Sequence, residues 1–313
     1  MMWLMLVLLA SLLDSIRIFI DNFLSDTFFK GKLAVSQKCF IIPAELVTAL
    51  ILMAITDFNF GNTELYIFFL IIFAGAIYTI GGIPYFKALE IEESTNIGIF
   101  IQLSPILYLI LGWLFLNESF SINQLFAIPI ILLAPIIIVA NTRKRSRKIK
   151  LRAILYAFIY VLFAVIGNLI FIKTISLKSN QLDFFNVTAF FYLGMCISNI
   201  IIIATHPKWR KRFFSVAKKN KLKLLAPMTA NFIINIIKNL TYRAGLLIAP
   251  TVAIASAASD SVEPIIIFFM GIVLTLIWPQ FGREKLQKKT ILVHLVATVL
   301  VVVGIVLLQL PNV

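Results

Sequence analysis

Long apolar stretches make up most of the chain, and short polar segments separate them. A helix that crosses the hydrocarbon core of a bilayer needs about 20 mostly apolar residues. Ten stretches meet this template, at 2–24, 36–57, 64–87, 93–117, 120–141, 153–177, 184–205, 224–247, 254–278 and 290–310. We therefore predict an all-α integral membrane protein with ten transmembrane helices.

The composition supports a membrane protein over a soluble one. Hydrophobic residues make up 61% of the 313 residues, charged residues make up 13%, and the mean hydropathy is +1.00. This leaves too little polar surface to cover a soluble globule. The formal net charge of +14 would suggest a nucleic-acid partner in a soluble protein. Here the basic residues gather in the gaps between apolar stretches, so no nucleic-acid partner is predicted.

The distribution of lysine and arginine predicts the topology. Basic clusters follow the odd-numbered predicted helices, including 143–152, 208–223 and 283–289. Basic loops remain in the cytoplasm, so both termini are predicted to lie outside. Because each half has five helices, the second half enters the bilayer with opposite polarity, as an inverted repeat. The predicted organisation is a first repeat at 1–142, a cytoplasmic connector at 143–152 and a second repeat at 153–313.

The basic segment from Lys208 to Lys223 allows two interpretations. Its aromatic residues Trp209, Phe213 and Phe214 lie among lysines and arginines, a composition that suits an interfacial helix on anionic lipid. A solvated run of charges in the longest loop, 207–223, would give the same composition.

Two related motifs occur in the same order in the two halves. Each has a Pro-Ile pair followed by a glycine, with a tyrosine upstream and a glutamate downstream: Tyr85, Pro105-Ile106, Gly112 and Glu118 in the first half, and Tyr242, Pro264-Ile265, Gly271 and Glu284 in the second. Internal repeats in a hydrophobic chain are typical of transporters, whose binding sites lie near the membrane midplane. The two copies differ chemically, since the first has Ile101 and Ser104 where the second has Asp260 and Glu263.

With these motifs the chain resembles the EamA-type branch of the drug/metabolite transporter superfamily. Further residues that carry the resemblance are Ala88-Leu89, Ser104, Asn117, Gln124, Ala244, Gly282-Arg283 and Gly304. The resemblance implies a ten-helix secondary transporter that moves small organic metabolites without ATP hydrolysis. The chain departs from the family in three ways. Pro264 and Glu284 lie further apart than Pro105 and Glu118, the termini are predicted to lie outside, and the first helix contains charges.

Charged residues inside predicted helices are the main candidates for function. Burying one at the bilayer centre costs about 2.5 to 3.5 kcal/mol, so such residues normally face the protein interior. Asp14, Arg17 and Asp21 share one face of the first helix, either along a pathway or as a self-neutralising ladder. Lys238 is predicted either to pair with Asp14 or with Glu263 in one resting state, or to extend to the outer headgroups; Arg243 is predicted to extend to the outer headgroups.

Three acids are candidates for proton or ion coupling. They are Glu263, Asp260 and Asp14. Glu263 precedes Pro264, which removes a backbone donor beside the acids. A position near the outer surface would instead account for Asp260 and Glu263 without any function.

The resemblance also implies a set of substrate-binding residues. Family members line their cavity with helices 1, 3, 4, 6, 8 and 9, which selects Asp14, Arg17, Tyr78, Gln102, Asn168, Asn235, Lys238 and Glu263.

Other classes of protein lack support in the sequence. There is no G-x-x-x-x-G-K-[ST] motif for nucleotide hydrolysis and no set of residues typical of a catalytic triad, so we predict no enzyme. His206, His294, Cys39 and Cys196 stand apart from one another, so no metal and no cofactor is predicted.

The predicted function is secondary transport of a small polar organic metabolite, with an amino acid or related zwitterion as the best specific substrate. Transport would proceed by alternating access around a central cavity, in a monomer or homodimer in the bacterial plasma membrane. One alternative is a membrane enzyme acting on a lipid-linked substrate, with its acids and bases at the headgroup interface. Another is a receptor or assembly factor without a solvent-connected cavity.

Overall fold

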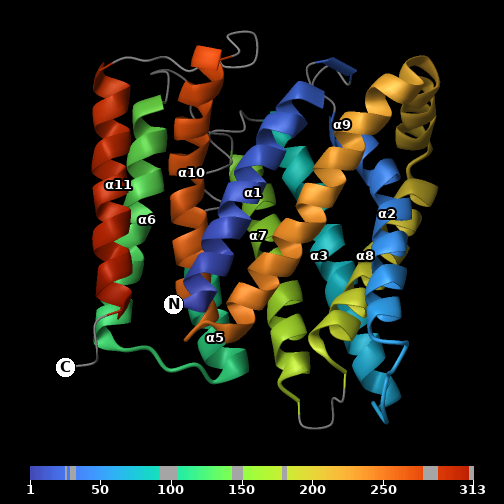
Figure 1. Cartoon of the computed structure of the whole chain (residues 1–313), viewed down its shortest axis with the longest axis horizontal. Helices are drawn as coiled ribbons and strands as arrows, with labels where there is room; N and C mark the ends of the chain where they lie inside the picture. The colour runs from blue at the N-terminus through green and yellow to red at the C-terminus, as the bar shows by residue number, and fades with distance from the viewer. Residues whose placement is uncertain are drawn as a thin grey trace. The chain divides into compact units, whose positions relative to one another are not determined.

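The computed structural model describes residues 1–24, 27–28, 33–91, 104–142, 151–177, 182–277 and 288–309. These residues form helices and short connections, with no strand among them, so the all-α prediction is confirmed for this part of the chain. The helices are α1 (Met2–Leu24), α2 (Leu33–Ile55), α3 (Leu65–Ile91), α5 (Ser104–Leu116), α6 (Ile122–Thr142), α7 (Leu151–Ile175), α8 (Phe184–Thr205), α9 (Pro207–Ile248), α10 (Val252–Ile277) and α11 (Lys288–Gln309) (Figure 1).

Within the part of the chain that the structure describes, five helical segments are long and apolar enough to cross a membrane. They are Met2–Asp21, Leu65–Tyr85, Leu151–Ile175, Phe184–Thr205 and Val252–Val273. Large apolar side chains such as Phe69, Trp113 and Leu292 are more than half exposed, which suits contact with lipid rather than with water. These features indicate a multi-pass integral membrane protein.

The interpretation of 207–223 as a loop is wrong. This segment is the first part of α9, a single helix of 42 residues. Pro207 occupies the first turn, where a helix needs no backbone donor, and no glycine or proline follows until Pro227. Hydropathy placed the helix start at 224 because it measures affinity for the membrane and not the tendency to form a helix. Lysine and arginine lower the hydropathy of 207–223, but they are good helix formers.

The chain divides into two compact units. Unit 1 comprises Met1–Ile16, Lys87–Val161 and Ile237–Val313, and unit 2 comprises Arg17–Phe86 and Leu162–Ile236. Each unit combines segments from both halves of the sequence. The chain passes from one unit to the other inside four helices, α1, α3, α7 and α9.

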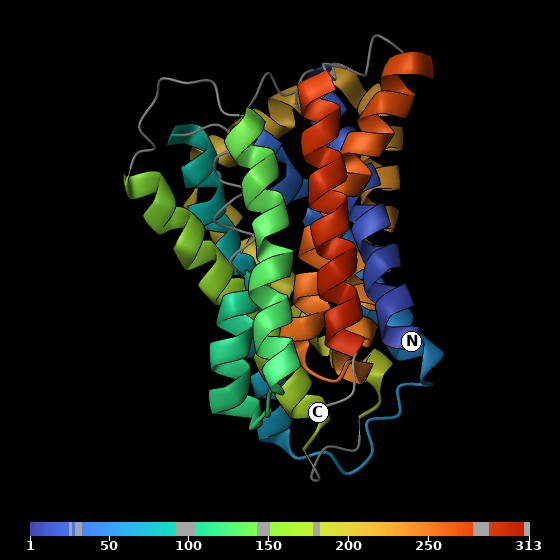
Figure 2. The same cartoon turned by 90° about the vertical axis from the view of Figure 1, so that its left-hand side faces the viewer.

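In unit 1, α6 and α11 pack side by side along their lengths, and α10 packs on both (Figure 2). Their shared core contains Ala134, Ile265, Ala297 and Val301, all at most 7% exposed. Small and β-branched side chains at these positions let the helices approach closely, which is how helices associate where lipid weakens the hydrophobic driving force.

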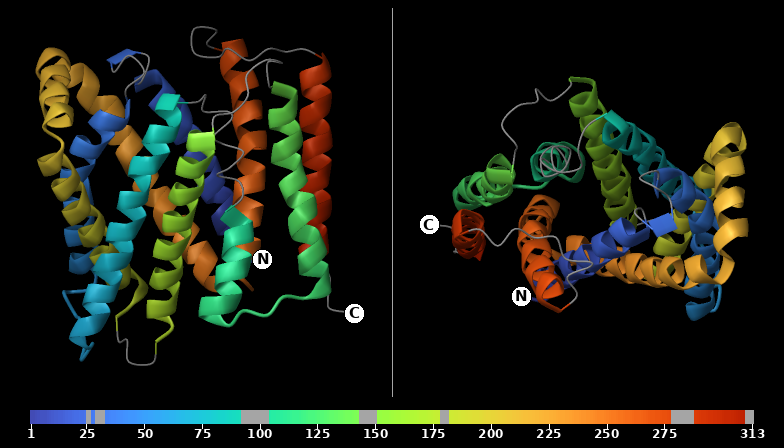
Figure 3. Two further views of the ribbon diagram at one scale, coloured as in Figure 1. Left: turned by 180° about the vertical axis from the view of Figure 1, so that it is seen from behind. Right: turned by 90° about the horizontal axis from the view of Figure 1, so that it is seen from above.

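In unit 2, α8 packs against α2 and α3 (Figure 3). Two glycines allow α3 and α8 to touch through their backbones. A Cβ on Gly75 would lie 2.0 Å from the Phe191 carbonyl oxygen, and one on Gly194 would lie 2.0 Å from the Ile72 carbonyl oxygen. Larger residues cannot occupy either position without separating the two helices.

Polar contacts show that α2 and α8 run antiparallel. Thr56, just after the end of α2, donates to the Asn186 Oδ1 atom near the start of α8 at 2.8 Å. Further along, Glu45 in α2 meets Asn199 late in α8.

Candidate functional site

Polar side chains from four helices of unit 1 gather in an otherwise apolar region. We call them the unit 1 polar cluster: Ser11 and Asp14 from α1, Ser104 from α5, Lys238 and Tyr242 from α9, and Ser256, Ser259 and Asp260 from α10. The cluster combines acids, a base and hydroxyl groups, and two of its four helices, α1 and α10, are long and apolar enough to cross a membrane.

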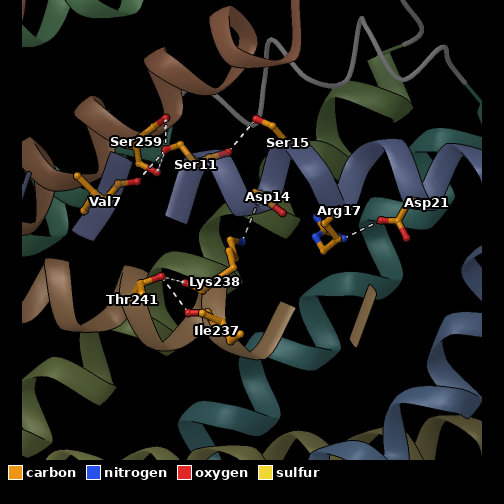
Figure 4. A network of polar contacts seen from close by, with 10 residues as sticks. All are labelled: Val7, Ser11, Asp14, Ser15, Arg17, Asp21, Ile237, Lys238, Thr241 and Ser259. Atoms are coloured by element: carbon orange, nitrogen blue, oxygen red, sulfur yellow. Dashed lines mark hydrogen bonds and ion pairs between the residues drawn. The ribbon is translucent and has the colours of Figure 1, made fainter. Parts of the chain in front are cut away.

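An ion pair joins α1 to α9. The Lys238 Nζ atom lies 3.0 Å from the Asp14 Oδ2 atom, and the two side chains are 18% and 13% exposed, respectively (Figure 4). Lys238 also lies over the Tyr242 ring, 6.0 Å from its centroid. Of the two partners predicted for Lys238, the structure has Asp14. Mutual neutralisation accounts for the presence of both charges in a buried setting.

Hydroxyl groups from two helices surround Asp260. Its Oδ2 atom accepts hydrogen bonds from Ser104 on α5 and, at 3.0 Å, from Ser256 one turn earlier on α10. Tyr242 hydrogen-bonds Ser256, and the charges of Lys238 and Asp14 act on Asp260. Asp260 lies in the third turn of α10.

Two buried serines connect α1 to α10. The Ser11 Oγ atom lies 2.9 Å from the Ser259 Oγ atom and 3.1 Å from the Ser259 carbonyl oxygen (Figure 4). Ser15 donates to the Ser11 carbonyl oxygen at 2.8 Å. The bonds between Ser11 and Ser259 hold the polar faces of the two helices together.

Glu118 connects the end of α5 to the start of α10. Asn117 adopts a left-handed conformation (φ 56°), and the Glu118 N–H donates to the Gly112 carbonyl oxygen, a helix-ending pattern. The Glu118 Oε1 atom then accepts the Val252 N–H at 2.9 Å. Burial raises the pKa of the Glu118 carboxyl, and the Val252 hydrogen bond partly opposes this shift.

The predicted charged face of α1 has two separate parts. Arg17 pairs with Asp21 at 2.8 Å within the helix, and Asn231 on α9 also donates to Asp21. Asp14 belongs to unit 1, whereas Arg17, Asp21 and Asn231 belong to unit 2. The ladder interpretation therefore fits Arg17 and Asp21, and Asp14 pairs with a different helix.

The remaining predicted residues occupy varied settings. Tyr78 packs edge-on against Phe191 with their ring centroids 5.7 Å apart, as a packing residue would. The others are Asn168, buried in unit 2, Asn235, partly exposed in unit 2, Glu263, partly exposed in unit 1, and Gln102, which is outside the described residues. Of the predicted site, the structure thus brings together Asp14, Lys238 and Asp260.

The prediction for Arg243 is wrong. Its side chain is 2% exposed, so it is buried in unit 1 rather than extended to the headgroups. Helix α9 continues beyond it to Ile248, and the close packing of Gly245 against Val7 keeps this stretch of α9 inside the protein.

Sequence reasoning did not select Ser104, Ser11 or Glu118 as site residues. Ser104 could have been found from the repeat comparison, because it is the counterpart of Glu263. Ser11 lies one turn before Asp14 on the same face of α1, which was a usable signal. Glu118 enters the sequence analysis only as part of the repeated motif.

A shallow apolar hollow of about 560 Å³ lies elsewhere, on α3 in unit 2. Its walls are Tyr66, Phe69, Leu70, Ile72, Phe73 and Ala76. It contains no charged side chain and is distinct from the unit 1 polar cluster, so we assign it no role in binding a polar molecule.

Comparisons with known proteins agree with this architecture. A solved protein crystal structure, whose title states no activity, has a TM-score of 0.68 and 11% sequence identity, with 98% of this chain and 96% of that chain covered. At this identity the likeness shows the fold alone. No curated protein matches the sequence. Residues 1–140 match the EamA-like transporter family, so this part of the chain belongs to that family, within the drug/metabolite transporter superfamily.

Proposed function

We propose that the protein is a secondary transporter of a small polar organic metabolite, with an amino acid or related zwitterion as the best candidate. The observation that carries the proposal is the unit 1 polar cluster, in which an acid–base pair joins α1 to α9 and hydroxyl groups bind an acid of α10. Membership of residues 1–140 in a transporter family supports transport over catalysis. A bacterial inner membrane is the proposed location.

The charges of the cluster complement those of a zwitterion. A substrate ammonium group would pair with Asp14 or Asp260, and a substrate carboxylate would pair with Lys238. Binding would then exchange the Asp14–Lys238 ion pair for two pairs with the substrate. This exchange gives substrate binding a direct effect on the contact between α1 and α9, as alternating access requires.

Proton coupling would use acids of the same region. Asp260, Asp14 and Glu263 are the proposed groups, and all three belong to unit 1. Arg17, Tyr78, Asn168, Asn235 and Gln102 remain predicted substrate-binding residues.

Helix pairing supports the inverted repeat with halves at 1–142 and 153–313 and a connector at 143–152. Under this repeat α5 corresponds to α10, α6 to α11 and α2 to α8, and each helix packs on its counterpart. Both α2–α8 and α5–α10 run antiparallel, as the contacts of Thr56 with Asn186 and of Glu118 with Val252 indicate. In Figures 1 and 2 the start of α1 and the end of α11 lie at the same end of unit 1.

The first part of α9 is proposed to contact anionic lipid. This segment is helical, and Phe214 is exposed (62%) beside the exposed residues Arg210, Lys211 and Lys218. An apolar ring among cations suits the headgroup region of an anionic leaflet. Native mass spectrometry should find fewer retained anionic lipids in Lys211→Gln/Lys218→Gln than in wild type; equal retention would refute this contact.

The proposed function is tested in two steps with purified protein. A thermal-shift screen of metabolites identifies ligands, and counterflow in proteoliposomes then measures exchange of each hit, in wild type and in Glu263→Gln. Zwitterions that both stabilise the protein and exchange would support the proposal. A ligand that is chemically converted would favour the enzyme alternative, and stabilisation without exchange would favour a receptor.

A further inference from the structure

The carboxyl group of Glu118 has two oxygen atoms in different settings. The Oε1 atom accepts the Val252 N–H at 2.9 Å. The Oε2 atom is buried, and no hydrogen-bond donor reaches it from the residues that the structure describes. It lies against the backbone of Gly112, where a Cβ atom would come within 2.6 Å of it. An ionised carboxylate would therefore leave charge on a buried oxygen without a donor.

We propose that Glu118 is a protonation-dependent latch, which holds the end of α5 against the start of α10 while the Oε2 atom carries a proton and releases them when it ionises. A protonated carboxyl keeps its carbonyl oxygen, so the bond from Val252 persists in this state. The proton comes from solvent water and returns to it. Glu118 acts through the position of α10 and is a positioning residue.

The direction of the effect follows from linkage. Burial raises the pKa of Glu118, and among the described residues no charged side chain contributes to this shift. Among the described residues, the carboxyl lies against the Gly112 backbone of α5 and the Val252 amide of α10. The closed state binds the proton more tightly than a hydrated open state, so acid favours closure and alkali favours opening.

The latch joins α5 to α10, the two helices that also meet at Asp260. Ser104 on α5 donates to Asp260, which lies about two turns from Val252 on α10. Opening of the Glu118 contact would change the distance between the two helices that share this carboxylate. The inference concerns this motion and does not depend on the proposed substrate.

The protonation state is tested by infrared difference spectroscopy of purified protein in lipid. Wild type minus Glu118→Gln should show a protonated carboxyl band at a pH just above the ordinary pKa of a glutamate, and the band should disappear at a second, distinctly alkaline pH. The matched control is Glu64→Gln, which alters an exposed acid outside the helices. Absence of a Glu118 band at the lower pH would overturn the proposal, because the group would then be ionised while buried.

Motion is tested by hydrogen exchange of peptides that cover 249–258, corrected for the intrinsic dependence of exchange on pH. Exchange in wild type should rise about tenfold or more between the two pH values, and in Glu118→Gln it should stay low at both. Gly112→Ala, whose Cβ would displace the Oε2 atom, should exchange rapidly at both values. Equal exchange in wild type at the two pH values, or the same rise in Glu118→Gln, would overturn the latch. Neither readout requires transport, so failure here is distinguishable from failure of the proposed function.

Discussion

Removal of the Lys238 charge tests whether the Asp14–Lys238 ion pair stabilises unit 1. Lys238→Met keeps an apolar side chain of similar reach but leaves the Asp14 carboxylate without its cation, 3.0 Å away in the wild type. Breaking a fully buried pair costs about 3 to 5 kcal/mol. Since the two side chains are 18% and 13% exposed, we expect a smaller loss of about 2 kcal/mol, or about 30-fold in the unfolding equilibrium.

The assay is reversible unfolding in bicelles, run as a double-mutant cycle with Asp14→Asn. The double variant should recover part of the loss, with a coupling energy of about 1 to 2 kcal/mol. Lys211→Met, which removes an exposed lysine of α9, should leave the stability within about 0.5 kcal/mol of wild type. Strictly additive single-variant effects would refute the ion-pair argument. Wild-type uptake and efflux by Lys238→Ala would refute its role in the transport cycle.

Three further variants test other parts of the structure. Asn199→Ala removes the amide that donates to both oxygens of the buried Glu45 carboxylate, at 3.0 and 2.9 Å, and should lower the free energy of unfolding by about 2 kcal/mol; no loss would show that Glu45 does not need this donor. Gly194→Ala places a Cβ atom 2.0 Å from the Ile72 carbonyl oxygen and should cost about 3 kcal/mol in the same assay, whereas unchanged stability would contradict the backbone contact of α3 with α8. Because burial raises the pKa of Glu118, its contribution to stability is present in acid and lost as the pH rises through the folded-state pKa; thermal unfolding of wild type should show this loss relative to Glu118→Gln, and parallel pH profiles would exclude it.

The helices could be predicted from the sequence because a bilayer imposes a strong length requirement on apolar segments. The wrong start predicted for α9 has the same origin, because hydropathy detects apolar segments only. The lysine-rich segment from Pro207 onward is also helical. Arg243 shows the complementary error. An arginine near a helix end was expected to extend to headgroups, but its burial depends on neighbours that hydropathy does not contain.

The candidate site was predictable in its charges but not in its partners. Asp14, Lys238 and Asp260 stood out because an ion in an apolar helix is costly. Their contacts depend on how α1, α5, α9 and α10 pack, so the hydroxyl of Ser104 beside Asp260 could not be read from spacing along one helix. The division of the charged face of α1 between units 1 and 2 was likewise invisible in its regular spacing.

The unit 1 polar cluster is proposed to bind the transported molecule. The most direct test is counterflow of a hit zwitterion in proteoliposomes, comparing Asp260→Asn with Asp57→Asn, an identical change at an exposed loop position of left-handed conformation (φ 51°) that asparagine tolerates. We predict that Asp57→Asn exchanges substrate at the wild-type rate and that Asp260→Asn loses at least about 90% of it, as expected for loss of about 1.4 kcal/mol or more of binding. Equal exchange by the two variants would contradict the claim.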